Sequence, residues 1–221
     1  AKEKGSLDNR LSAIQALVSL SIYQEEHDEA ERLLETFVEE NKDLGSPQET
    51  LFVNVELGYL KAKLGNIAEG LDMLRGAISE LKLQPPSQTL VEARLREAQI
   101  LVFRPDPWAA RRALEQLVLD PNAQPAEEAR RLEYLARVLL DLGEAKGAFQ
   151  AASKSVVLAS SIRDTKTKLR AKLSILRVRA SRGEHAVKVS RELKHLVKKQ
   201  RLMGDHEGTA ATYVFTAREA V

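Results

Sequence analysis

Residues 51–81 read LFVNVELGYLKAKLGNIAEGLDMLRGAISEL, and this stretch decides the fold. Its apolar residues recur three or four positions apart over residues 51–64 and again over 67–81, which is the period of an amphipathic helix. Gly65 separates the two halves, and glycine is the residue that most often follows the end of a helix. The stretch therefore predicts two helices joined by a tight turn at Gly65.

The same break recurs along the chain at a nearly constant spacing. Gly143 and Gly183 separate further pairs of apolar-periodic stretches, and Glu25 and Pro105 take the equivalent position in two others. These five positions are 40, 40, 38 and 40 residues apart. Five residues after each of the first four breaks stands a small residue, namely Ala30, Gly70, Ala110 and Ala148. Small side chains at one fixed position let two helices approach closely, so the pattern predicts a stack of helical pairs.

Helix-start signals mark the boundaries between these units. Ser46 is followed by Pro47 and, three residues after the serine, by Glu49, which is typical of a capped helix N-terminus. Asp106-Pro107 repeats the cap and the proline. No stretch alternates with period two, so we expect no sheet. We predict helices of roughly 13–18 residues, with an eleventh helix starting near Thr209.

The predicted fold is an all-α, right-handed α-solenoid of about five helix-turn-helix repeats plus one extra C-terminal helix. The repeats are expected at 7–45, 46–85, 86–123, 124–162 and 163–205, with the start of a sixth at 207–221. They form one domain over residues 1–221. Because the chain begins at Ala1 and ends inside an amphipathic pattern, we expect it to be a piece of a longer protein.

Several residues of the second unit resemble the tetratricopeptide repeat (TPR). The matching residues are Leu57-Gly58-Tyr59, Leu64-Gly65-Asn66, Glu69-Gly70, Leu74 and Ala77, and Leu142-Gly143-Glu144 with Ala148 resembles the same turn. The period near 40 exceeds the 34 of that family, and the only tryptophan, Trp108, stands at the start of a second helix. Longer repeats of this kind are similar to those in the sensor arms of MalT-type bacterial transcription regulators. HEAT-like repeats are the alternative. The turn glycine and the small residue in the second helix argue against a HEAT-like repeat.

Composition excludes several classes of protein. Charged residues make up 30% of the chain and apolar residues 43%, and there is no cysteine, which excludes disulfide frameworks and thiolate metal sites. No apolar run reaches the 18 residues of a membrane span, and no signal-peptide pattern opens the chain. We expect a cytoplasmic protein, or a periplasmic one if a signal has been removed.

No constellation of catalytic or metal-binding residues is recognisable. The four histidines are not spaced as helical metal ligands, and no nucleophile elbow or phosphate-binding glycine loop is present. We therefore expect no enzyme activity, no catalytic or metal site and no cofactor.

Charge is distributed unevenly. Residues 163–202 contain 14 basic residues against Asp164, Glu184 and Glu192. Such a block suggests an acidic partner, a nucleic acid or head-to-tail self-association. It contains no aromatic residue, which counts against binding of single-stranded nucleic acid.

The resemblance to TPR proteins implies a concave groove lined by the first helix of each pair. In this register the partner-binding residues are Phe52, Tyr59, Gln99 and Phe103 in a semi-apolar front part, and Arg130, Arg137, Arg170 and Arg177 in a basic rear part. The arginines would bind an acidic segment of a protein partner. The alternative is interhelix packing for the aromatic residues and salt bridges with Glu127, Glu133 and Asp141 for the arginines.

The predicted function is a non-catalytic protein–protein interaction scaffold that binds a peptide or protein segment in its concave groove. One alternative is a ligand- or partner-sensing regulatory arm of a larger bacterial signalling or transcription protein. Another is nucleic-acid binding through residues 163–202. Tyr213, Val214 and Phe215 give the last helix apolar surface without a second helix to cover it, so self-association through this end is also possible.

Overall fold

The computed structural model describes residues 9, 13, 14, 16, 17, 20, 26–41, 47–84, 87–103, 106–184 and 186–219. These residues contain ten helices and no strand, which confirms the prediction of an all-α chain. The helices are α2 (His27–Asn41), α3 (Pro47–Lys63), α4 (Ile67–Leu81), α5 (Gln88–Phe103), α6 (Pro107–Gln116), α7 (Pro125–Asp141), α8 (Ala145–Ser161), α9 (Thr165–Ser181), α10 (Ala186–Leu202) and α11 (His206–Glu219).

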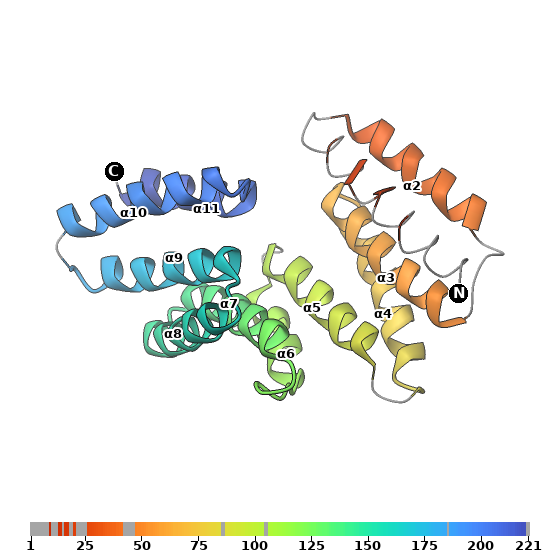
Figure 1. Cartoon of the computed structure of the whole chain (residues 1–221), viewed down its shortest axis with the longest axis horizontal. Coiled ribbons are helices and arrows are strands. Elements are labelled where there is room, and N and C mark those ends of the chain that lie inside the picture. The colour runs from red at the N-terminus through yellow and green to blue at the C-terminus, as the bar shows by residue number, and fades with distance from the viewer. Residues whose placement is uncertain are drawn as a thin grey trace. The chain divides into compact units, whose positions relative to one another are not determined.

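The chain forms two compact units, residues 1–100 and 101–221, and each is described by itself (Figure 1). The expectation of one continuous solenoid stays a prediction. In the second unit, α9 packs against α7, α8, α10 and α11. The first helices of the pairs, α3, α5, α7, α9 and α11, begin 41, 37, 40 and 41 residues apart, in agreement with the period near 40.

The predicted turn glycines lie where helices of a pair meet. Gly65, Gly143 and Gly183 have φ angles of 105°, 78° and 71°, in the left-handed region that favours glycine. In each turn the glycine amide donates to the carbonyl three residues back, and the next amide donates to the carbonyl five residues back. This is the Schellman motif, which ends a helix and satisfies its last carbonyls.

The turns between successive pairs use the same geometry. Gly204, between α10 and α11, has a φ of 64°, and Arg163, between α8 and α9, has a φ of 60°. Both turns have the two Schellman hydrogen bonds. Arg163 is the only non-glycine residue with positive φ in the described part of the chain.

Replacing Arg163 with glycine is expected to raise the free energy of unfolding by about 1 kcal/mol, because the Cβ penalty of the left-handed conformation disappears. The Arg163 side chain is exposed, so no packing is lost. The reverse change at the equivalent position of another turn, Gly143→Arg, is expected to lower stability by a similar amount. Urea denaturation of both variants checks this, and an R163G protein no more stable than the parent would contradict it.

The small residues of the repeated column were predicted to lie at close helix crossings, and the structure shows such a crossing at Gly70. Gly70, Ala110 and Ala148 are buried, and the side chain of Ala30 lies outside the described set. A Cβ on Gly70 would come closer than 3.0 Å to the Gly58 carbonyl oxygen and to Ala62. The backbones of α3 and α4 are therefore in direct contact at this point.

Helix α6 departs from expectation, since it has only ten residues. Its start is as predicted, because the Asp106 side chain accepts a hydrogen bond of 2.9 Å from the Ala109 amide. At Leu117 the backbone turns extended, with φ −85° and ψ 97°. In a continued helix the Pro121 ring would clash with the Leu117 carbonyl, so the helix ends before it.

Two apolar clusters organise the second unit. The first joins α7, α8 and α9 through residues such as Leu132, Leu139, Ala151 and Val178. The second joins α9 and α10 through Leu169, Leu173, Leu176, Val189, Leu193 and Leu196, and Phe215 of α11 packs against it. Together they fix the positions of the helices that carry the charged and apolar surfaces described below.

Candidate protein-binding surfaces

The residues predicted for the front of a groove lie mostly in the interior of the first unit. Phe52 is half-buried and packs against the core cluster that contains Val53, Leu57 and Leu60. Tyr59 and Gln99 are 8% and 7% exposed. Phe103 is helical, and its side chain lies outside the described set. Phe52 and Tyr59 thus take part in packing within this unit, and partner binding by the four front residues stays a prediction.

Tyr59 is enclosed by a charged network that sequence reasoning missed. The Arg96 guanidinium lies 4.2 Å from the centre of the Tyr59 ring, a cation–π geometry. Arg96 also lies 3.3 Å from both Glu56 and Glu92. Glu56 and Arg96 are 40 residues apart on successive first helices, so a search for opposite charges at the repeat period would have found them.

The four predicted arginines lie on first helices, Arg130 and Arg137 on α7 and Arg170 and Arg177 on α9. Each has a carboxylate of the same chain as its partner. The distances are 3.9 Å for Arg130–Glu127, 3.9 Å for Arg137–Glu133 and 3.3 Å for Arg177–Asp141. These are the three salt bridges that the sequence offered as the alternative to partner binding.

Two further carboxylates come from the start of α11 and were not anticipated. Arg170 lies 2.6 Å from Asp205 and 2.9 Å from Glu207, and Arg137 lies 3.3 Å from Glu207. The Asp205 side chain is fully buried and accepts a hydrogen bond from the Gly208 amide. Burial raises the pKa of Asp205, but the hydrogen bonds and charge of Arg170 outweigh burial and leave that pKa below its ordinary value. The chain's own α11 thus supplies the acidic groups that were expected from a partner.

These groups form one arginine–carboxylate cluster, which consists of Glu133, Arg137, Arg170, Arg177, Asp205 and Glu207. Five of its members line a cavity of about 60 Å³, far smaller than the several hundred Å³ of an ordinary ligand pocket. Glu133 is 3% exposed, and burial raises its pKa to about 7 against the opposing effect of Arg137 and Arg170. As folded, the cluster has no room for a peptide.

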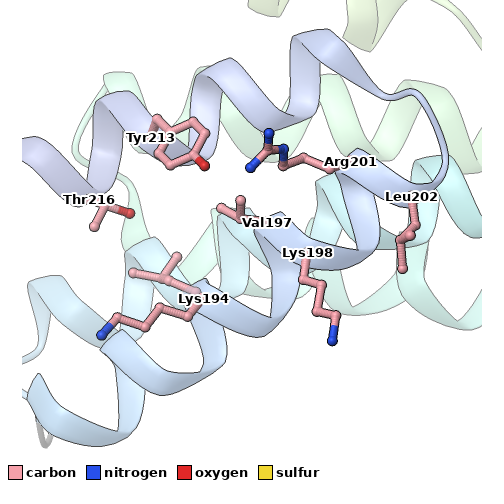
Figure 2. A pocket seen from close by; sticks show the side chains of 8 residues that line it. Lys194, Val197, Lys198, Arg201, Leu202, Tyr213 and Thr216 are labelled. Carbon is pink, nitrogen blue, oxygen red and sulfur yellow. The ribbon is translucent and has the colours of Figure 1, made fainter.

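An open groove lies between α10 and α11. Its volume is about 590 Å³, and its lining consists of Leu193, Lys194, Val197, Lys198, Arg201, Leu202, Tyr213 and Thr216. Figure 2 shows Tyr213 and Thr216 on the α11 side, across from Val197 and Arg201 of α10. Leu202 is 78% exposed and Tyr213 50%. Tyr213 therefore adds apolar surface to α11 as predicted, whereas Phe215 packs inward.

The rim of this groove is positively charged. Helix α10 has six basic residues and one acidic residue, Glu192, which is paired with Arg179 at 2.9 Å. Lys194, Lys198 and Arg201 are exposed and form no ion pair with any residue that the structure describes. The groove thus combines uncovered apolar side chains with uncompensated cations.

Within the described ranges, no helix is long and apolar enough to span a membrane. The same residues include no group of three or more metal-ligating side chains of the His, Cys, Asp and Glu types.

Comparison with known proteins identifies the fold. No protein-family model matches the chain, and no curated protein matches it. The chain is similar to two crystal structures of a candidate kinesin light chain from Podosopora anserina with nearly identical TPR-like repeats. One of the two is a variant with a single substitution. They are 17% identical, with TM-scores of 0.63 and 0.62, and the alignments cover 89% and 88% of this chain and 97% and 96% of those chains. The chain therefore has the fold of TPR-like helical repeats.

Proposed function

We propose that this chain is a non-catalytic protein-interaction scaffold that binds an acidic amphipathic helix of a partner protein in the α10–α11 groove. The observation that carries the proposal is the combination around one groove of exposed Leu202 and Tyr213 with Lys194, Lys198 and Arg201, which form no ion pair with the described residues. The TPR-like fold supports a scaffold in general terms, because stacked helical pairs present extended binding surfaces.

The shape of the groove favours a helix as its occupant. Leu193, Val197 and Arg201 follow one another at four-residue spacing and line one ridge of α10. Helices pack by placing such ridges into the groove between the helices opposite. The second unit already contains this arrangement, since α9 packs against both α7 and α8. A partner helix with apolar residues at positions i, i+3, i+4 and i+7 would pack against α10 and α11 in the same way.

The charge of the rim favours an acidic helix. Carboxylates on the flanks of a docked helix would pair with Lys194, Lys198 and Arg201, and a basic helix would be repelled by them. Partner binding at Arg130, Arg137, Arg170 and Arg177 stays a prediction. Because carboxylates of the same chain already occupy those arginines, the α10–α11 groove is the better-supported site.

The test uses a fluorescent 21-residue amphipathic peptide with a leucine face flanked by glutamates. We expect the protein to bind it at least tenfold more tightly than an isomer of equal composition without an apolar face. The double variant L202S/Y213S should weaken binding by about tenfold or more, and K194E/K198E by a similar factor.

Lys188→Glu is the matched control, since this exposed lysine of α10 does not line the groove. Its affinity for the peptide should stay within about twofold of the parent, because an exposed charge outside the site contributes little. Equal binding of both peptide isomers, or undiminished binding by L202S/Y213S, would count against the proposal.

A further inference from the structure

The α10–α11 groove exists only while α11 is packed onto the second unit, because Tyr213 and Thr216 form one of its sides. Several kinds of contact hold α11. Phe215 packs against the α9–α10 core, and the Thr212 hydroxyl is 2.9 Å from the Gln200 side-chain oxygen. The Arg177 guanidinium of α9 lies 5.9 Å from the centre of the Phe215 ring. Ion pairs join the N-terminal end of α11 to α7 and α9.

These ion pairs connect three helices. Glu207 of α11 bridges Arg137 of α7 and Arg170 of α9, and Arg170 also binds Asp205 just before α11. The side chains of Arg137 and Arg170 are only 18% and 11% exposed and that of Asp205 is fully buried, whereas that of Glu207 is 31% exposed. Solvent therefore screens the pairs of Glu207 in part and the Arg170–Asp205 pair little. The position of α11 therefore depends on the charge balance within the cluster.

Glu133 lines the same cavity, and its protonation or ionisation changes the net charge of the cluster. The charged groups around it are Arg137 on its own helix, Arg170 and Arg177 on α9, Glu207 on α11 and Asp205 in the turn. When Glu133 is neutral, both Arg137 and Arg170 are available to the acidic groups of α11. When it is ionised, it competes with Glu207 for Arg137, from which it lies 3.9 Å away, and it repels Glu207 and Asp205.

We infer that Glu133 regulates the α10–α11 groove: its protonation favours the attachment of α11 by leaving the two arginines to Glu207 and Asp205, and its ionisation loosens α11. The effect on partner binding rests on the proposed function. The effect on α11 itself does not.

The direction of the pH dependence follows from linkage. With α11 attached, burial raises the pKa of Glu133 to about 7. Detachment of α11 removes the nearby Glu207 and Asp205 charges and admits solvent, so the pKa falls toward its ordinary value. Since the attached state binds the proton more tightly, attachment is strongest below the pKa of the detached state and is progressively lost as the pH rises through about 7.

Amide hydrogen exchange of the partner-free protein tests this. After correction for the intrinsic pH dependence of exchange, the opening equilibrium of α11 should increase roughly threefold to tenfold from pH 6 to pH 8, since one proton changes it by at most about tenfold per pH unit. The Glu133→Gln variant should exchange slowly at both pH values. Glu127→Gln, on the same helix but outside the cluster, should retain the pH dependence of the parent.

If the corrected opening equilibrium of α11 in the parent protein is the same at pH 6 and pH 8, the inference is wrong. This test does not depend on how any variant folds. A pH dependence that persists in Glu133→Gln would overturn it as well. Loss of binding of the acidic peptide at every pH, with the exchange behaviour of α11 as expected, would contradict only the proposed function.

Discussion

Replacing Arg170 with methionine is expected to lower the free energy of unfolding of the second unit by about 3–5 kcal/mol, the usual cost of removing one partner of a buried ion pair. Methionine fills much of the space of the arginine stem but leaves the fully buried Asp205 carboxylate without its 2.6 Å partner. Urea denaturation followed by Trp108 fluorescence and circular dichroism measures the loss, because Trp108 is the only tryptophan and lies in this unit.

The double variant R170M/D205N is the control. Asparagine removes the stranded charge and can still cap α11, so the double variant should recover more than half of the lost stability. The lowered pKa of Asp205 adds a pH signature. The stabilisation by the pair is present above the ordinary pKa of an aspartate and is lost as the pH falls through the lowered value. A loss below about 1 kcal/mol in R170M would show that the pair is solvent-screened like a surface salt bridge.

Replacing Gly70 with alanine is expected to lower the free energy of unfolding of the first unit by about 1–3 kcal/mol, as overpacking does in well-packed interiors. The added Cβ would come within 3.0 Å of the Gly58 carbonyl oxygen and of Ala62. These are backbone and Cβ atoms, which cannot rotate away, so α3 and α4 must move apart. Thermal unfolding followed by far-ultraviolet circular dichroism measures the effect.

Gly76 provides a matched control in the same helix. It is exposed, and an added Cβ would meet nothing within 4 Å. Gly76→Ala should therefore raise stability by about 0.5–1 kcal/mol through helix propensity alone. If G70A and G76A changed stability in the same direction, the close crossing would not be the reason for glycine at position 70.

The features that sequence reasoning predicted are local. A turn such as that at Gly65 depends on the conformational freedom of one residue, and the buried Ala148 follows from the periodicity of its own helix. Arg163 was missed because its turn has no glycine, although its backbone has the same left-handed geometry. A pattern search that relies on residue type does not find such a position.

The environment of the predicted site residues depends on which segments cover them. The resemblance to TPR proteins implies that Tyr59 and Arg137 lie on the inner faces of their helices, but it does not show that Arg96 lies over the tyrosine or that Glu207 reaches the arginine. Arg137 and Glu207 are 70 residues apart. The groove between α10 and α11 was missed for the same reason, since it is a property of two helices and not of either sequence alone.

The excess positive charge of α10 has a kinetic consequence. In the cluster each arginine is matched by nearby carboxylates, whereas Lys194, Lys198, Arg201 and their neighbours give α10 an excess of positive charge that extends as a field into solvent around the groove. Such a field accelerates the diffusional encounter with an oppositely charged partner, and dissolved ions screen it over about 10 Å at 0.1 M ionic strength. Added salt should therefore slow association with an acidic helix while the dissociation rate, set by the apolar contacts of Leu202 and Tyr213, stays nearly constant.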